Sequence, residues 1–247
     1  MAATRRTYVV NGLDLDAGTY RLLESTQASA GLAPRLASVE VYGRDGAVPV
    51  GGDYLAAGEL GLVVAVATGD FAARLDAEAR VGAALRVKTS SGLGQVVLKG
   101  PGIERECGFR LKSLAWQEKT PGVSVGQIVL DLPRPIWQAP LESRRDGLAP
   151  GVVEFEELAG GSAPVEVTWL LPGGVPSFNA SCVVSGETTR FSTSRPTVGE
   201  TMLRGLGRPV GVDQWGRVWP DREGRYRARV SGGGVKTFGW KAKKSWL

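Results

Sequence analysis

The sequence predicts a mainly β protein, with one α-helix in its first part and a β-sandwich in its second part. Three observations support this prediction. The chain has 35 glycines and 14 prolines, spread along its length and not packed into one tract. Between them lie short runs rich in Val, Leu and Thr, and in the second half turn signals recur about every 8–12 residues, as in β-sandwiches. Only one stretch has the length and composition of a helix.

The first strands are predicted from alternation and turn residues. Residues 8–10 form a short apolar run that ends at Asn11-Gly12, a dipeptide typical of tight hairpin turns. Residues 14–34 are mixed in character, so we expect mainly loop there. Residues 60–68 are apolar on both faces of the predicted strand, so we expect both faces to be covered.

One helix is predicted over residues 71–88. Asp70 precedes it and is a suitable N-cap, and basic residues at its end suit the helix dipole. The apolar positions predicted to form its buried stripe are Phe71, Leu75, Ala79 and Ala83. The positions expected to face solvent are Arg74, Glu78 and Arg86.

A long hairpin and a domain boundary follow. Residues 104–116 and 127–132 predict two strands joined by a turn at Thr120-Pro121-Gly122, and Pro133 and Pro135 then end the second strand. We place a domain boundary near residue 140, which gives domains 1–140 and 141–247. In the second domain the predicted strands are 152–157, 165–171, 179–184, 188–192, 210–213, 225–230 and 235–242.

The chain contains no histidine, which narrows the chemistry that it can perform. Ser-His-Asp and Cys-His arrangements are excluded, and so are the usual imidazole-based metal sites. We therefore expect no catalytic residue, no metal and no cofactor. Cys107 and Cys182 lie far apart without CxxC spacing and are expected to be buried free thiols. The GxG pairs at 92–94 and 205–207 are expected to be hairpin turns, because neither continues as a phosphate-binding motif.

Charge is distributed unevenly along the chain. Residues 141–189 hold two basic and seven acidic residues, whereas residues 190–247 hold thirteen basic and four acidic ones. Such asymmetry is typical of a nucleic-acid surface or of complementary faces in an oligomer. No recognition helix or RNA-binding motif is present, so sequence-specific nucleic-acid binding is not expected. The remaining hypothesis is pairing of the two segments between subunits.

Tryptophans are the candidate surface residues. Exposed rings on a β-sandwich can stack on sugars, but tryptophan is more often found in cores and protein interfaces, which is the interpretation that we favour. The residues nominated for an assembly or binding surface are Trp137, Trp215, Trp219, Trp240 and Trp246. Glu154 and Glu156 share one face of a predicted strand, which is more typical of a solvated face than of a catalytic pair.

No apolar run reaches the length needed to span a bilayer, since the longest is residues 60–68. No apolar segment follows the arginines near Met1, so no signal peptide is expected. These features predict no membrane association and synthesis in the cytoplasm.

In their order along the chain, these features resemble the distal tail protein (Dit) family of long-tailed bacteriophages, which includes minor tail proteins of phages that infect actinobacteria. High Arg and Ala usage agrees with a GC-rich actinobacterial host. The resemblance covers nearly the whole chain and is based on the order of features. The matching segments are 8–14, 60–68, 71–88, 104–132, 132–137, 160–165, 171–174 and 239–247.

The resemblance implies a ring-forming belt domain over residues 1–140 and a galectin-like β-sandwich over 141–247, with the last strand, 235–247, able to return to the first domain. It also implies a non-enzymatic virion protein at the tail tip, made in the host cytoplasm. Its hexameric ring would join the tail tube protein to the tail-tip hub protein in the baseplate, with DNA passing through the lumen without specific binding. A carbohydrate-binding module for a host-surface glycan is the first alternative, and a carboxylate-based cell-wall hydrolase is the second.

Overall fold

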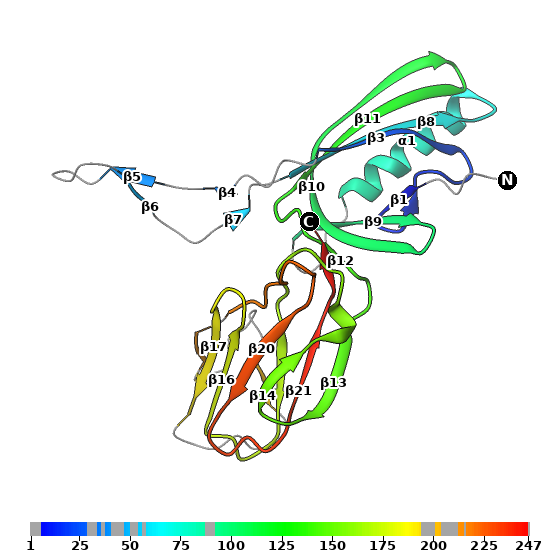
Figure 1. Cartoon of the computed structure of the whole chain (residues 1–247). Coiled ribbons are helices and arrows are strands. Elements are labelled where there is room, and N and C mark those ends of the chain that lie inside the picture. Colours follow the sequence, from blue (N-terminus) through cyan, green and yellow to red (C-terminus); the bar gives the residue numbers. More distant parts are fainter. Residues whose placement is uncertain are drawn as a thin grey trace. The chain divides into compact units, whose positions relative to one another are not determined.

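The structure is a computed structural model that describes residues 6–28, 34–35, 38–40, 47–49, 54–55, 58–86, 92–193, 201–203, 212–214 and 216–246. Contacts along the chain divide it into two units, Met1–Pro135 and Ile136–Leu247. Strands dominate both units, and the described residues contain one α-helix (Figure 1). The predicted fold class, mainly β with one helix in the first part, is therefore confirmed.

The first unit holds eleven of the described strands and the helix. Four of these eleven strands form two separate small ladders, β4 with β7 and β5 with β6. The elements are β1 (Thr7–Val10), β2 (Leu13–Asp14), β3 (Tyr20–Ala28), β4 (Pro34–Arg35), β5 (Ser38–Glu40), β6 (Ala47–Pro49), β7 (Tyr54–Leu55), β8 (Gly58–Ala67), α1 (Phe71–Arg86), β9 (Gly94–Gly100), β10 (Ile103–Thr120) and β11 (Val123–Leu132).

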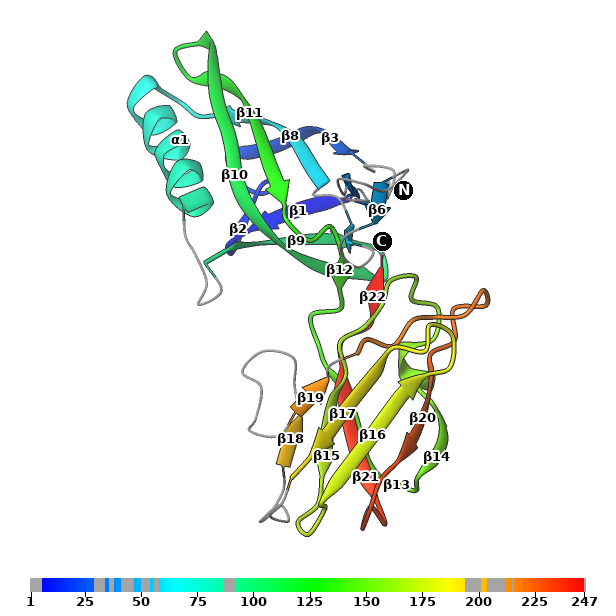
Figure 2. The same cartoon turned by 90° about the vertical axis from the view of Figure 1, so that its left-hand side faces the viewer.

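The main sheet of this unit has the order β2-β1-β9-β10-β11-β8-β3. The long strand β10 links its two parts, because Ile103 to Phe109 pair with β9, whereas Arg110 to Thr120 pair with β11. Figure 2 shows β10 curving from one part of the sheet to the other. The predicted hairpin is confirmed, and both of its strands are longer than expected.

The start of the chain forms the predicted tight turn, but one long strand was missed. Asn11 and Gly12 have φ angles of 45° and 87°, so both adopt the left-handed conformation that this hairpin turn requires. The prediction of mainly loop over residues 14–34 was wrong for β3, which pairs with β8 along its whole length. A β-bulge between Leu22 and Glu24 interrupts the alternation that would have identified the strand.

Helix α1 begins as predicted but buries a different face. The Asp70 carboxylate accepts a hydrogen bond from the Ala73 N–H at 2.8 Å, which confirms the N-cap. The predicted buried stripe was wrong, since Phe71 is 50% and Leu75 43% exposed and Ala79 and Ala83 also face outward. The residues that α1 buries are Arg74, Ala77, Val81 and Leu85. The predicted end at Lys88 lies outside the described residues.

The helix covers only one face of the sheet, which corrects the prediction for β8. Leu60, Leu62, Val64 and Val66 are at most 1% exposed on the helix side. The residues of the opposite face are Gly61, Val63 and Ala65, which are half-buried, and Ala67, which is exposed. Coverage on both sides was therefore a wrong expectation for the single chain, because the described residues of this unit supply one helix and it packs on one face.

The second unit is a sandwich of two sheets with the orders β13-β21-β15-β18 and β14-β20-β16-β17-β19. A short pair, β12 with β22, lies outside them and places Trp137 opposite Trp246. The elements are β12 (Trp137–Gln138), β13 (Ser143–Leu148), β14 (Gly151–Glu154), the 3-10 turn η1 (Glu156–Leu158), β15 (Thr168–Leu171), β16 (Ser177–Cys182), β17 (Thr188–Ser192), β18 (Thr201–Leu203), β19 (Val212–Gln214), β20 (Arg227–Ser231), β21 (Phe238–Ala242) and β22 (Ser245–Trp246).

One aromatic core joins the two sheets of this sandwich. Phe155 packs edge-on against Trp240 with ring centroids 4.8 Å apart, and Trp169 lies 5.3 Å from Phe178. Both tryptophans are at most 1% exposed. The Tyr226 hydroxyl donates to the Ala163 carbonyl at 2.7 Å, and burial raises the pKa of this phenol. Aromatic packing of this kind stabilises beyond the area that it buries.

The acidic and basic segments of the second unit pair with each other inside it. Lys241 contacts Glu142 at 3.2 Å, and Arg217 contacts Glu187 at 3.5 Å. These pairs join residues 141–189 to residues 190–247, because strands from both segments alternate within the same sheets. Part of the charge asymmetry is therefore compensated within one chain, and the hypothesis of pairing between subunits loses that support.

Candidate assembly and binding surfaces

The strands β10, β11, β8 and β3 form a four-stranded part of the first unit's sheet with two open edges. Residues 110–120 of β10 pair with β11 on one side, and no other described strand of this unit pairs with them. β3 ends the sheet on the other side, where it pairs only with β8 among the described strands. Each edge presents backbone N–H and C=O groups that can bind a further strand.

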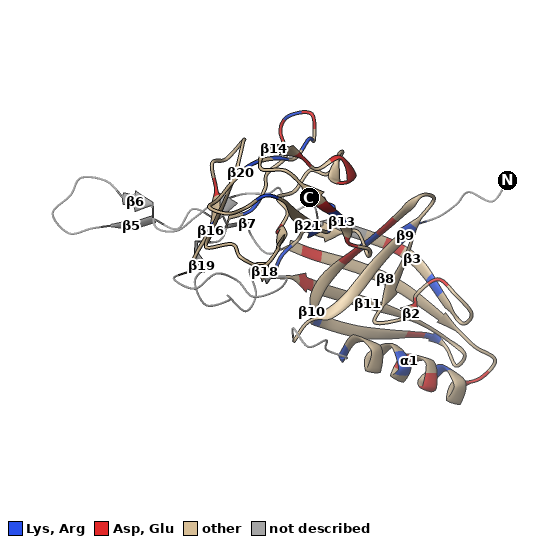
Figure 3. Cartoon of the chain, turned by 90° about the horizontal axis from the view of Figure 1, so that it is seen from below, with Lys and Arg blue, Asp and Glu red and all other residues tan. Residues whose placement is uncertain are grey.

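On the central strands β8 and β11, the face that α1 does not cover carries small, mostly uncharged side chains. Val63 and Ala65 of β8 lie beside Gln127 and Val125 of β11 in the strand register, and all except Gln127 are half-buried. β8 and β11 carry one charged residue each, Glu59 and Asp131 (Figure 3). Lys112 pairs with Glu59, which raises the pKa of the lysine. By register, Arg21, Glu24 and Arg110 of the edge strands lie on the same face, so its basic and acidic side chains are similar in number.

A buried arginine fixes the end of the hairpin against the helix. Arg74 is 3% exposed, and its guanidinium contacts the Glu118 carboxylate at 2.8 Å and Glu78 at 3.5 Å. It also donates to the Thr120 carbonyl at 3.3 Å. The prediction that Arg74 faces solvent was wrong, because the charge is compensated where β10 passes over α1. The open edge of β10 is therefore held in a defined place.

The turn of the same hairpin is attached to the start of α1 by backbone contacts. The Thr68 N–H donates to the Gly122 carbonyl at 2.8 Å, and the Thr68 hydroxyl donates to the same oxygen at 3.2 Å. A Cβ atom at Gly122 would lie 2.6 Å from the Thr68 carbonyl oxygen. Glycine is therefore required here by close backbone approach.

The nominated tryptophans do not form one surface. Trp137 is 2% and Trp240 0% exposed, and Trp240 belongs to the core of the second unit. Trp219 and Trp246 are half-buried, and Trp215 lies outside the described residues. Buried rings fill space and cannot stack on a ligand.

The two half-buried rings are already engaged. The Trp219 indole N–H donates to Glu187, and the Arg217 guanidinium lies 5.3 Å from the centre of the Trp219 ring. Lys244 lies 5.5 Å from the centre of the Trp246 ring. A sugar platform needs a free ring face, so these contacts weaken the hypothesis of neutral-sugar stacking.

The acidic residues considered at first are engaged in ion pairs. Glu156 was predicted to lie in the strand with Glu154, which was wrong. It lies in η1, where it contacts Arg145 at 3.4 Å. Asp221 contacts Arg225 at 3.1 Å, and hydrogen bonds from the Arg225 and Glu223 backbones lower the pKa of its carboxyl. Among the described residues, no group of three or more Cys, Asp or Glu side chains is placed to hold a metal ion.

Both cysteines are buried free thiols, as predicted. Burial raises the pKa of Cys107 to about 12, and its thiol donates to the Arg134 carbonyl at 3.4 Å. The Cys182 sulfur accepts hydrogen bonds from the backbone N–H groups of Trp219 and Ser185. A thiol with a raised pKa is a poor nucleophile.

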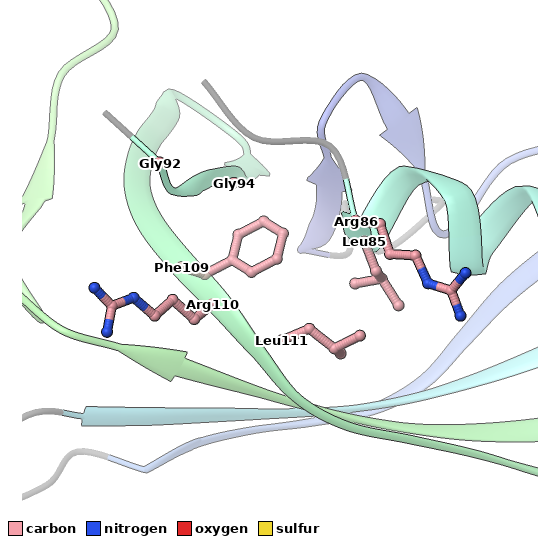
Figure 4. A pocket seen from close by; sticks show the side chains of 7 residues that line it. All are labelled: Leu85, Arg86, Gly92, Gly94, Phe109, Arg110 and Leu111. Atoms are coloured by element: carbon pink, nitrogen blue, oxygen red, sulfur yellow. The ribbon is translucent and has the colours of Figure 1, made fainter. Parts of the chain in front are cut away.

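A pocket of about 330 Å³ lies in the first unit between the end of α1 and the start of β10's second half. Leu85, Phe109 and Leu111 form its apolar centre, whereas the side chains of Arg86 and Arg110 extend away from it in opposite directions (Figure 4). Specific small-molecule sites usually have a few converging polar groups. This pocket lacks them among the residues that line it.

No helix among the described residues is long and apolar enough to cross a membrane. Sequence comparison gave no relatives: no protein-family model matches the chain, and no curated protein matches it.

Solved structures do match. The crystal structure of the Dit protein of phage SPP1, described as a paradigm of the hub adsorption apparatus in phages that infect Gram-positive bacteria, superposes with a TM-score of 0.66 and 13% identity. That match covers 98% of this chain and 100% of the SPP1 chain. Two structures of the activated phage P2 baseplate, with Ca and with Sr, match over 97% of this chain and 98% of theirs. Their identities are 9% and 10%, and their TM-scores are 0.46 and 0.45. The chain therefore has a Dit-like fold over nearly its whole length, which confirms in fold the resemblance drawn from the sequence, whereas the actinobacterial host stays a prediction.

Proposed function

We propose that this chain is a structural protein of a bacteriophage tail tip and forms a ring that joins the tail tube protein to the tail-tip hub protein. The observation that carries the proposal is the pair of open edges on the β10-β11-β8-β3 sheet. Edge β3 of one copy can pair with edge β10 of the next. Because the two edges differ, this contact is head-to-tail and generates a closed ring when the rotation closes.

Six copies are the proposed number, as the family resemblance drawn from the sequence implies. Closing the sheets into one barrel places one face outside, under α1, and the other face inside. The uncovered face would then line the lumen. It is nearly neutral, with Lys112 paired to Glu59, so DNA would pass without being held by a basic patch.

The proposal predicts the effect of a charge at the open edge. Leu23 lies at the bulge of edge strand β3 and is 43% exposed. Leu23→Lys should block edge pairing, because a lysine on an edge strand resists addition of another strand. Leu141→Lys is the matched control, since Leu141 is 80% exposed and lies in the second unit.

The measurement is light scattering with negative-stain imaging of purified protein, mixed with the tail tube and hub proteins of the same phage. Rings of about six times the 26.1 kDa chain mass support the proposal. They should form with the Leu141→Lys protein and be lost with the Leu23→Lys protein. Absence of rings in the presence of both partner proteins, or rings that tolerate Leu23→Lys, would contradict it.

A further inference from the structure

One face of the second unit carries a polar surface that takes no part in the strand pairing proposed for the first unit. It is the outward face of the β14-β20-β16-β17-β19 sheet. In the central strand β16, Phe178, Ala180 and Cys182 point into the core, and the alternate residues point outward. The outward residues of β16 and its two neighbours are Ser177, Asn179, Ser181, Thr188, Arg190, Ser192, Arg227, Arg229 and Ser231.

Two arginines stand on opposite sides of β16. Arg229 of β20 is the register partner of Ser181, and Arg190 of β17 is the register partner of Asn179. Both arginines are exposed. From standard strand spacings, their Cα atoms are about 12 Å apart, with short Ser and Asn side chains between them. Hydroxyl and amide side chains of β16 therefore lie between two guanidinium groups on this face.

These two guanidinium groups have no ion-pair partner among the described residues. Other arginines of the unit do have one: Arg227 contacts Asp221 at 3.2 Å, and Arg217 contacts Glu187. The Asn179 Oδ1 atom is buried and also has no hydrogen-bond partner in the described part of the chain. One carboxylate, Glu154, is exposed at the margin of the face, opposite the paired Arg227. Within the described part of the chain, the two arginines therefore leave positive charge at the centre of this face without a carboxylate partner.

We propose that this face binds an anionic polysaccharide. A guanidinium group forms strong charge-assisted hydrogen bonds to phosphate and carboxylate, and sugar hydroxyls can pair with the Ser181 hydroxyl between the arginines.

Two other kinds of ligand fit the face less well. Neutral sugars are usually held by stacking on aromatic rings, and the outward residues named above include none. A protein partner usually needs a buried apolar centre, and the outward residues of β16, β17 and β20 named above include no large apolar side chain. The inference is independent of the ring, because it concerns a sheet of the second unit and not the edges of the first.

The test uses the full chain and four immobilised probes: poly(glycerol phosphate), polygalacturonate, neutral dextran and poly-glutamate. Binding is measured by biolayer interferometry at about 0.15 M salt, where screening weakens interactions beyond about 8 Å. We expect binding to at least one anionic glycan and none to dextran. A preference between the first two probes identifies phosphate or carboxylate as the recognised group.

The variants are Arg190→Gln, Arg229→Gln and Ser181→Asp. Each arginine substitution should weaken binding about tenfold, as loss of one charge-assisted hydrogen bond implies. Ser181→Asp should abolish binding, because it places a negative charge between the two arginines. Arg222→Gln is the control. Arg222 is exposed in the turn before β20, so this substitution removes one positive charge outside the proposed binding face. Circular dichroism of each variant checks that it is folded.

Three results would overturn the inference. The first is no binding to either anionic glycan. The second is equal loss of binding with Arg222→Gln, which would show attraction to net charge alone. The third is tighter binding to poly-glutamate than to both glycans, which would assign the face to an acidic protein segment.

Discussion

The two units of this chain differ in how far they cover their own sheet faces and strand edges. The second unit closes its core within itself, because two sheets cover each other around Trp169, Trp240 and Phe155. The first unit covers one face of its sheet with α1 and leaves the other face and two strand edges open. It also leaves Phe71 and Leu75 of α1 half-exposed.

The difference indicates where assembly should occur. Open edges and uncovered apolar faces are usually blocked in proteins that remain monomeric. A unit that keeps them is suited to be completed by other copies, whereas a closed sandwich is suited to present side chains to a ligand. Four predictions test this contrast, from the largest expected effect to the smallest.

Truncation in the closed core should have the largest effect. Trp240→Ala removes a fully buried ring that packs on Phe155, and it should lower the free energy of unfolding by about 4 kcal/mol. Trp240→Phe should cost much less, because the indole N–H has no hydrogen-bond partner among the described residues. Denaturant unfolding of both variants measures the difference. Equal losses would show that ring volume does not determine stability here.

Loss of the buried cation should loosen the open unit. Arg74→Met removes the contacts with Glu118 and Thr120 and should cost about 2 kcal/mol. The cost stays below that of a fully buried pair, because the Glu118 side chain is 53% exposed and water can replace the arginine. Amide hydrogen exchange should accelerate at the C-terminal end of β10 and the N-terminal end of β11, which meet at the hairpin turn. It should stay unchanged in the second unit. Unchanged protection of the hairpin would contradict this role for Arg74.

A methyl group at the hairpin turn should have a smaller effect in the same place. Gly122→Ala brings a carbon against the Thr68 carbonyl and should cost about 1–2 kcal/mol by strain. Gly69→Ala is the control, because a Cβ there meets no atom within 4 Å. Thermal unfolding compares the two substitutions, and an equal change in Tm would argue against close packing at this turn.

The smallest effect concerns thiol ionisation. The pKa of Cys107 rises to about 12 in the folded chain, above its value of 9.0 without burial. The folded state therefore holds the proton more tightly, so this stabilising contribution is complete below pH 9 and is lost as the pH rises toward 12. At pH 8 a thiol reagent should react with Cys107 only after unfolding. Rapid labelling of the native protein would show that the thiol is accessible.

Local sequence determined the elements that depend on neighbouring residues. The turn at Asn11-Gly12, the N-cap at Asp70 and the hairpin around Gly122 follow from backbone preferences of those residues. The missing histidine and the distant cysteines likewise needed no structure to interpret. The order of these elements was enough to indicate a Dit-like fold.

Tertiary structure alone decided which surfaces are buried. Helix α1 has one apolar stripe through Phe71 and Leu75 and another through Ala77, Val81 and Leu85, and periodicity cannot choose between them. The second stripe packs on the sheet, and β10 supplies the Glu118 carboxylate and a backbone carbonyl to Arg74 on that side of the helix. Whether the second face of β8 is covered, and which arginines of the sandwich lack partners, likewise depends on residues distant in sequence. Burial and charge compensation depend on contacts between residues that are distant in sequence. A local sequence pattern describes only one of the two partners in each such contact.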